Sequence, residues 1–393
     1  MTENETHKGE KSTMLVSTKD VAKRIQAVKQ PGQKAVALSV KKGQLLLRGG
    51  FELDSFSLTW QQAIAEKPAD IDEVLLEHKI LAGITRAAPD ELNMDLSEEG
   101  IHLWTDNTYW KLPALDALNE KGDQPQKALP VSGKIKLGFE FPIARFREIV
   151  KLLATTASDD RTRPILTTTL IAHNGEQLVA CVTDTYRLRV LPIGEYCVKC
   201  GIDPLLLLGK WTQVETLPIV ALKAVAKAIT KFPRSCSEPV RLQLRAKAWT
   251  VSCGSVRLVA GYGSDQYPKV AKVIPSDKTV WALTLDTEEF RQVLKSLAPV
   301  AALDSNRVVL DWQSGENIIL KADDHYSEAE VAIPSNVKSK QEEWHTAFNY
   351  EYLLDGLEGR EGDITLTQSR PLDPILLDFA ADGLYVLMPM QIL

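Results

Sequence analysis

A repeated unit, a helix followed by a β-hairpin, constrains the fold of this chain more than any other feature. Apolar residues recur with the 3.6-residue period of an amphipathic helix in three segments, 17–29, 141–154 and 285–298. Each segment is followed by two alternating runs around a glycine turn: AVALSV-KKG-QLLLRG, TTLIA-HNG-EQLVACV and RVVLDW-QSG-ENIILKA. Asn174-Gly175 is the strongest of these turn signals, because glycine tolerates the positive φ that tight hairpin turns need.

The same pattern recurs more faintly in the second half of each third of the chain. Helices are expected at 73–84, 219–232 and 349–357, and strand pairs at 91–105, 239–259 and 363–390. An α+β chain without repeats can also be cut into such pieces, but the similar offsets of the three hairpins favour a repeat.

The chain is therefore predicted to have an α+β fold of three repeated domains, each with two helices packed on antiparallel sheets. Pro and Gly interrupt the pattern near residues 136 and 275. The expected divisions are a disordered polar tail at 1–13 and domains at 14–136, 137–275 and 276–393.

Composition narrows the class of protein further. Of the 393 residues, 44% are hydrophobic and 25% charged, which is ordinary for a globular protein and wrong for a disordered one. No apolar run approaches the roughly 20 residues of a membrane-spanning helix, and the polar N-terminus lacks the core of a signal peptide. Five cysteines are too few for a disulfide framework in a chain of this length, so a cytoplasmic location is expected.

Basic side chains recur beside the apolar stripes of the expected helices, although the net charge is -6. In helix 219–232, Lys223, Lys227 and Lys231 stack on one face, opposite Leu222 and Val225. A lysine row of this kind is usually just a solvated face. Its recurrence in four helices favours a shared surface that meets DNA phosphates by charge alone.

The helix at 349–357 departs from this trend, because Glu351 and Asp355 are acidic. The residues expected to face DNA are Lys19, Lys23, Arg24, Arg145, Arg147, Lys151, Arg161, Arg163, Lys223, Lys227, Lys231, Arg291 and Lys295.

The sequence offers no constellation for catalysis, and neither a cofactor nor a metal is expected. It has no P-loop, HExxH or serine-hydrolase motif. Cys197 and Cys200 lack the second pair that structural zinc needs and a thioredoxin-like context, so two unlinked thiols in a loop are expected. Asp184 has no partner nearby in sequence, and a buried structural carboxylate is the favoured interpretation.

Several segments closely resemble the bacterial DNA polymerase III β sliding clamp family. They are ATTASDDRTRPILTTTLI, CVTDTYRLRV, SDQYPKVAKVIP, FNYEYLLDGL and the ending LYVLMPMQIL, in this order across the second and third expected domains. The resemblance implies a homodimeric ring in which each chain contributes three domains, with helices lining the hole and sheets forming the rim. It also implies a non-catalytic polymerase subunit that encircles double-stranded DNA without sequence specificity.

Members of this family bind short linear peptides of DNA polymerases, the clamp loader and repair proteins between domains two and three. Carried over to this sequence, the peptide pocket comprises Leu166, Thr183, Thr185, Tyr186, Arg187, Leu188, Pro268, Lys272, Val273, Asn349, Tyr352, Pro374, Val386, Leu387, Met388, Pro389 and Met390. The dimer contact is expected edge strand to edge strand, with Tyr109 and Trp110 of one chain meeting Ala302 and Leu303 of the other.

Departures from the family pattern leave alternatives open. Thr185-Tyr186 stands where the family usually has Gly-His, Lys272 where Arg is frequent, and the segment 196–211 resembles an insertion. An accessory clamp of a phage or plasmid with altered partner choice is one alternative. A DNA-binding protein that forms no ring is another, and an enzyme using Cys197 and Cys200 is a third.

Overall fold

The computed structural model describes most of the chain. The described residues are 14–28, 34–51, 56–63, 70–88, 90–115, 131, 133–201, 210–230, 237–263, 266–275, 279–324, 326–334 and 336–392. The predicted tail at 1–13, Lys231 and half of the 196–211 segment, residues 202–209, lie outside these ranges.

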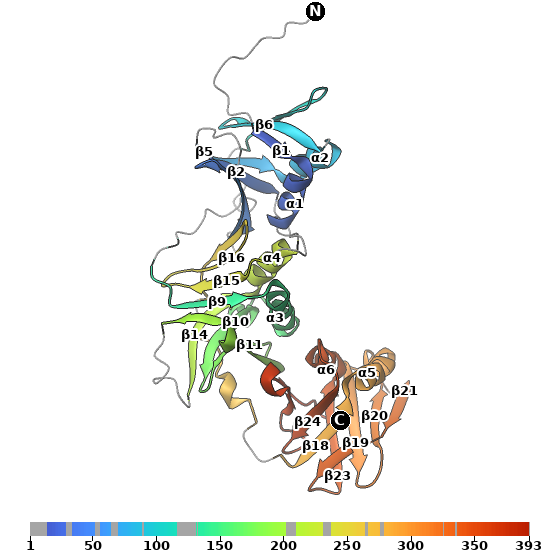
Figure 1. The fold of residues 1–393 in the computed structure, drawn as a ribbon. Helices are drawn as coiled ribbons and strands as arrows, with labels where there is room; N and C mark the ends of the chain where they lie inside the picture. Colours follow the sequence, from blue (N-terminus) through green and yellow to red (C-terminus); the bar gives the residue numbers. More distant parts are fainter. Residues whose placement is uncertain are drawn as a thin grey trace, which may run out of the picture. The chain divides into compact units, whose positions relative to one another are not determined.

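Six α-helices occur in the described part of the chain (Figure 1). They are α1 (Thr18–Val28), α2 (His78–Ala87), α3 (Ile143–Thr156), α4 (Ile219–Ile229), α5 (Thr287–Ala301) and α6 (Tyr350–Leu357). Five begin and end within a few residues of the predicted helices. None of the described helices is long and apolar enough to cross a membrane.

The helix predicted at 73–84 is wrong in its first half. Strand β5 (Ile71–Glu77) occupies that half, and α2 begins only at His78. Val74 and Leu76 alternate into the core, and β5 pairs with β2 (Ala35–Lys41) through Leu38↔Val74. Pairing with a strand more than thirty residues earlier overrides the local helical period here.

By internal contacts the chain divides into two compact units. The first comprises Met1–Arg147, Tyr196–Ile202 and Val220–Tyr262, and the second comprises Glu148–Glu195, Asp203–Ile219 and Gly263–Leu393. The middle third of the chain contributes to both units, because its strands join sheets with both flanking thirds. The domain boundaries predicted near residues 136 and 275 concern the sequence repeat and stay a prediction.

The first unit contains a four-stranded and a nine-stranded antiparallel sheet. The order of the smaller sheet is β1 (Met14–Ser17), β6 (Glu91–Ser97), β7 (Gly100–Trp104) and β8 (Tyr109–Pro113). The order of the larger sheet is β13 (Cys197–Cys200), β9 (Leu137–Phe141), β15 (Val240–Leu244), β16 (Trp249–Cys253), β17 (Val256–Ala260), β4 (Phe56–Ala63), β3 (Gln44–Phe51), β2 and β5. The two halves of this larger sheet join at β17 and β4, where Leu258 lies opposite Leu58.

The second unit repeats this arrangement. Its nine-stranded sheet has the order β14 (Trp211–Pro218), β10 (Thr168–Asn174), β11 (Leu178–Thr183), β12 (Arg187–Pro192), β26 (Leu384–Leu387), β25 (Ile375–Asp378), β24 (Asp363–Gln368), β18 (Trp281–Asp286) and β22 (Asn336–Ser339). Its four-stranded sheet has the order β21 (Glu328–Ile333), β20 (Ile318–Asp323), β19 (Arg307–Gln313) and β23 (Glu343–Asn349). The halves of the larger sheet join at β12 and β26.

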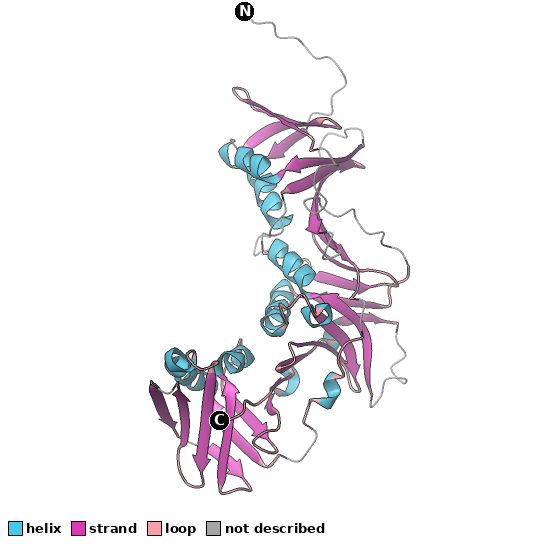
Figure 2. Ribbon diagram, turned by 180° about the vertical axis from the view of Figure 1, so that it is seen from behind, coloured by secondary structure: helices cyan, strands magenta, loops and turns pink. Residues whose placement is uncertain are grey.

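Helices cover one face of these sheets. In the second unit, α5 and α6 lie side by side over the strands (Figure 2). The apolar stripe of α5, with Phe290, Leu294 and Leu297, is buried in one core with Leu310 and Leu320 of the sheet. Burying such side chains stabilises the fold by roughly 1.5–3 kcal/mol each.

Local start and turn signals of the sequence are realised in the structure. Asp286 and Glu289 have the spacing of a capping box in the sequence, and the Asp286 carboxylate accepts a hydrogen bond from the Glu289 N–H at 2.9 Å and caps α5. Gly175 adopts a φ of +99° in the hairpin between β10 and β11, which confirms the Asn-Gly turn. The expectation that Cys197 and Cys200 lie in a loop is wrong, since both belong to strand β13.

Candidate functional site

A cavity of about 200 Å³ opens in the second unit where three distant segments meet. The segments are the β11–β12 turn, the chain around the 3₁₀-helix η4 (Val270–Lys272) and the end of strand β26. Its lining residues are Thr183, Thr185, Arg187, Leu188, Pro268, Lys269, Val270, Val273, Val386 and Met388. Because β12 pairs with β26, Leu188 lies directly opposite Val386, and the Met388 N–H donates to the Tyr186 carbonyl at 2.8 Å.

The cavity has a buried apolar floor and an exposed apolar rim. Leu188, Val270 and Val386 are at most 4% exposed and belong to one hydrophobic cluster. Val273 and Met388 are 42% and 36% exposed. A concave, mostly apolar surface of this kind is typical of ligand sites, and methionine adapts its shape to varied apolar groups.

The turn that forms one wall of the cavity is held by its own side chains. Asp184 Oδ1 accepts hydrogen bonds from the N–H groups of Tyr186 and Arg187, at 2.9 and 3.0 Å. Thr183 Oγ1 donates to the Arg187 carbonyl at 2.7 Å and accepts from the Thr185 N–H at 3.1 Å. Asp184 therefore organises this turn, in agreement with the structural role favoured from the sequence.

Tyr267, which the sequence did not single out, supports the same wall. Its hydroxyl accepts a hydrogen bond from the Thr183 N–H at 3.2 Å and donates to the Thr168 carbonyl at 3.3 Å. The side chain is 3% exposed, and its burial raises the pKa of the phenol. This hydroxyl therefore stays protonated and can serve both bonds at neutral pH.

Arg187 is fixed inside the wall, and its positive charge is largely neutralised by partners within the protein. Its guanidinium pairs with Asp184 at 2.8 Å and with Asp355, and donates to the Thr155 carbonyl at 2.8 Å. It also lies 4.2 Å from the ring centroid of Tyr352. Burial alone would lower the pKa of Arg187, but Tyr385, Asp355 and Asp184 raise it, so the group stays charged.

The acidic character of the last helix is explained by this network. Asp355 of α6 pairs with Arg187, and its carbonyl accepts from the wholly buried Arg189. Arg189 also donates to Thr156 Oγ1 at 3.1 Å and lies over the Tyr385 ring, at 4.8 Å from its centroid. This part of α6 therefore neutralises buried arginines instead of continuing a cationic surface.

The structure brings eight of the predicted pocket residues to the cavity and leaves nine outside its lining. The eight are Thr183, Thr185, Arg187, Leu188, Pro268, Val273, Val386 and Met388. The nine are Leu166, Tyr186, Lys272, Asn349, Tyr352, Pro374, Leu387, Pro389 and Met390. Lys269 and Val270 line the cavity but were not predicted, because nothing in the sequence distinguishes them from neighbouring residues.

Alternation along the last strand explains why Leu387 lies outside the lining. Val386 faces the cavity, so its neighbour Leu387 points to the opposite face of the sheet. Leu387 is wholly buried in the core below α5 and α6. Leu166, in the 3₁₀-helix η1 (Pro164–Thr167), is likewise 3% exposed and contributes to packing.

Three others have roles within the protein or beside the cavity. The Asn349 side chain caps α6 by accepting from the N–H groups of Glu351 and Tyr352, at 3.0 and 3.1 Å. Tyr352 lies against Arg187 on one side and stacks with Tyr186, with ring centroids 6.2 Å apart. Tyr186 is 58% exposed and so adds an aromatic surface next to the opening.

The predicted DNA-facing residues differ in whether their charged groups are exposed to solvent or engaged in contacts within the chain. Lys23, Arg147, Lys223, Lys227 and Lys295 are exposed on helices. The sequence pattern in α4 is confirmed, since Leu222 and Val225 are buried opposite its lysines.

Other members of that set are engaged in contacts within the chain. Arg24 lies 5.4 Å from the Trp60 ring centroid, and burial lowers the pKa of its guanidinium. Arg291 donates to the carbonyl groups of Leu357 and Arg360, at 2.9 and 3.2 Å. Lys19, Lys151 and Arg163 form exposed ion pairs with Asp90, Glu358 and Asp160.

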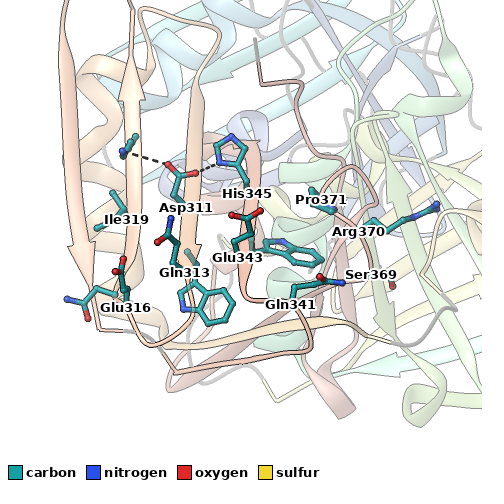
Figure 3. Close-up of a pocket in the computed structure, with 14 residues that line it drawn as sticks. Asp311, Gln313, Glu316, Ile319, Gln341, Glu343, His345, Ser369, Arg370 and Pro371 are labelled. Carbon is teal, nitrogen blue, oxygen red and sulfur yellow. Dashed lines mark hydrogen bonds and ion pairs between the residues drawn. The ribbon is translucent and has the colours of Figure 1, made fainter.

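A larger hollow of about 730 Å³ lies on the four-stranded sheet of the second unit (Figure 3). Polar and charged side chains dominate its lining, among them Gln313, Glu316, Gln341 and Glu343. Asp311 points toward His345 and shares a hydrogen bond with it. In the described ranges no three His, Cys, Asp or Glu side chains form a group that could hold a metal ion.

The fold is that of DNA polymerase III beta subunits. The structure of DNA polymerase III subunit beta from Pseudomonas aeruginosa superimposes with a TM-score of 0.78, over 96% of this chain and 100% of that chain, at 18% identity. At this identity the match establishes the fold.

Sequence comparisons then give the family. Residues 271–391 match the family described as DNA polymerase III beta subunit, C-terminal domain. A beta sliding clamp of Chlamydia pneumoniae is 25% identical over 259 residues, 65% of this chain and 65% of that protein. A beta sliding clamp homolog, GriR, of Streptomyces muensis is 23% identical over 80% of this chain and 78% of its own length.

Residues 271–391 therefore carry the C-terminal domain of DNA polymerase III beta subunits, and the chain as a whole has the beta sliding clamp fold and distant sequence similarity to beta sliding clamps.

Proposed function

We propose that this protein closes as a homodimer around duplex DNA and tethers the replicative DNA polymerase, in the cytoplasm at the nucleoid. The clamp loader and repair proteins would be its other partners. The observation that carries this proposal is the cavity of the second unit. Three segments meet around this cavity, and the first and last of them are more than a hundred residues apart in the chain. All three are assigned to peptide capture by resemblance.

The cavity suits a short peptide with large apolar anchors. Leu188, Val270 and Val386 form a floor against which a Leu or Phe side chain loses its contact with water. Met388 is held by its backbone bond to Tyr186, so its side chain is free to adjust to the anchor.

A charge placed at Met388 tests this role without disturbing the core. Met388→Glu puts a carboxylate on an exposed rim position and should weaken binding of a labelled peptide with adjacent Leu and Phe anchors by more than tenfold, measured by fluorescence polarisation. Met390→Glu, two residues further and outside the cavity lining, is the matched control and should bind as the wild type does. Equal loss in both variants, or dissociation of Met388→Glu into monomers, would contradict a role in peptide capture.

Retention on DNA would be topological. Exposed lysines such as Lys223 and Lys227 on α4 can meet phosphates without reading bases, which allows a ring to slide. Loaded protein should therefore stay on circular DNA and leave the same DNA after linearisation, measured by gel filtration of the complex. Equal retention on both forms would favour a DNA-binding protein that forms no ring.

Ring closure would use one outer edge of each four-stranded sheet. Strand β8 ends one sheet in the first unit, and β21 ends the other in the second unit. An edge strand presents unpaired N–H and C=O groups, which pairing between two chains would satisfy. The predicted contact residues Tyr109 and Trp110 belong to β8, and Ala302 and Leu303 directly follow α5.

An accessory clamp with altered partner choice is the alternative that one observation favours. Tyr186, where the family usually has His, places an exposed aromatic ring beside the cavity, stacked on Tyr352. Competition between peptides from the host replicative polymerase and from other clamp-binding proteins would separate the two roles.

A further inference from the structure

The Cys197-Val198-Lys199-Cys200 segment is a sequence motif to which clamp function assigns no role. It forms strand β13, at one edge of the nine-stranded sheet of the first unit, where it pairs with β9. Cys197 is half-buried and Cys200 is exposed, and the two thiols are not joined in a disulfide in this structure.

A bulge in this strand brings the two cysteines to one face. In a regular strand, residues three apart point to opposite faces of the sheet. Here the register shifts between Cys197 and Lys199, and Cys197 lies opposite Phe139 while Cys200 lies opposite Leu137. Phe139 and Leu137 are two residues apart on β9 and share a face, so their cysteine partners share that face as well.

The spacing suits a covalent link between the two thiols. Two register positions along a strand correspond to about 6.6 Å, within the roughly 4.4–6.8 Å that disulfides span between Cα atoms. Burial raises the pKa of the Cys197 thiol, and the neighbouring Cys200 thiol, hydrogen-bonded to it, raises it further. The exposed Cys200 is therefore the sulfur that meets an oxidant first.

We propose that Cys197 and Cys200 form a redox modification site that closes to a reversible disulfide by exchange with a low-molecular-weight disulfide such as oxidised glutathione. The Cys200 thiolate attacks one sulfur of the oxidant, forms a mixed disulfide and expels one thiolate. The Cys197 thiolate then attacks the Cys200 sulfur and expels the second thiolate. Two protein thiols become one disulfide, two molecules of glutathione are produced, and the two thiol protons end on them.

Closure would fix the bulge at the sheet edge. Next to the motif, the Gly201 N–H donates to the Lys136 carbonyl at 2.6 Å. A disulfide that spans the bulge restricts the motions that open this bond. It also holds β13 in one register, and an edge with a fixed bulge pairs less readily with other chains.

Tryptic mapping of the full-length protein tests the link directly, because trypsin cuts after Lys199, between the two cysteines. The folded protein is equilibrated with oxidised and reduced glutathione, alkylated, denatured and digested. Fragments 190–199 and 200–210 should remain joined and should separate on reduction. The equilibrium constant for closure should be at least tenfold higher in the folded protein than in the same chain in urea, or about 30 mV for a two-electron couple.

Matched variants identify the pair. Cys197→Ser should leave Cys200 as a glutathione adduct, Cys200→Ser should leave Cys197 as a thiol, and the buried Cys181 and Cys253 should stay reduced in both. Hydrogen exchange at Gly201 should slow at least threefold in the oxidised wild type. Separate glutathione adducts on both cysteines, or equal closure in urea, would overturn the proposal. None of these readouts depends on DNA or peptide binding.

Discussion

Thr185 shows at the scale of one residue how this chain departs from its family. It adopts a φ of +86°, in the left-handed region that favours glycine, at the position where the family usually has Gly. The hydrogen bonds of Thr183 and Asp184 hold the turn in this conformation despite the cost. Threonine at this position therefore strains the backbone, but it adds a side chain to the cavity wall.

Thr185→Gly should relieve this strain. We expect the free energy of unfolding to rise by up to about 1 kcal/mol. The left-handed conformation costs a non-glycine residue about 1–2 kcal/mol, and this cost disappears with glycine. Glycine also makes the unfolded chain more flexible, which offsets part of the gain in stability. Urea denaturation measures the change. Thr108→Gly, at an exposed turn residue that is not among those with positive φ, is the control and should lose stability. A loss of the same size at both sites would show that Thr185 is not strained.

Helix α6 shows how an element can support a cavity wall without lining the cavity. Asn349 begins the helix as its cap, and Tyr352 and Asp355 on the helix hold Arg187 in the cavity wall. The resemblance assigned Asn349 and Tyr352 to the peptide pocket, and neither residue lines the cavity. Their effect on peptide binding would therefore be indirect.

Asn349→Ala separates capping from ligand contact. Loss of two hydrogen bonds at the helix start should lower the free energy of unfolding by about 1 kcal/mol. Asn317→Ala, at an exposed position, should change it by less than about 0.5 kcal/mol. Thermal unfolding and peptide titration of the same samples measure the stability and the peptide affinity of each variant. Reduced peptide affinity with unchanged stability would instead indicate that Asn349 contacts the peptide directly.

At the scale of the whole molecule, each unit contains a nine-stranded sheet and a shorter four-stranded sheet. The four-stranded sheets end on one side in β8 and β21, and apolar side chains are exposed on β8 and in the turn after α5, the helix that packs against β21. Tyr109 is 59% exposed and Leu303 is 62% exposed. Pairing these edges between two chains would bury both side chains and complete the sheets.

Leu303→Asp should therefore split the dimer. We expect sedimentation to report the 43.6 kDa chain mass for this variant and twice that mass for the wild type at micromolar concentration. Leu372→Asp replaces a leucine that is 70% exposed in a turn away from both edges, and should remain dimeric. A wild type that sediments as a monomer, or a dimer that survives Leu303→Asp, would refute this edge contact.

Local features of the fold and part of the site could be predicted from the sequence by itself. The helical period located five helices, the alternating runs located the hairpins, and Asn174-Gly175 and Asp286 set a turn and a helix start. These signals are short-range, because side-chain periodicity, glycine φ and capping depend on residues a few positions apart. The family resemblance added eight of the residues that line the cavity.

Only the tertiary structure decided which strands become neighbours. Pairing of β12 with β26 creates the cavity and sends Val386 toward it but Leu387 into the core. Pairing of β5 with β2 shortens a predicted helix, and the bulge in β13 turns Cys197 and Cys200 to one face. Each outcome depends on register between segments distant in the chain, which local periodicity does not encode.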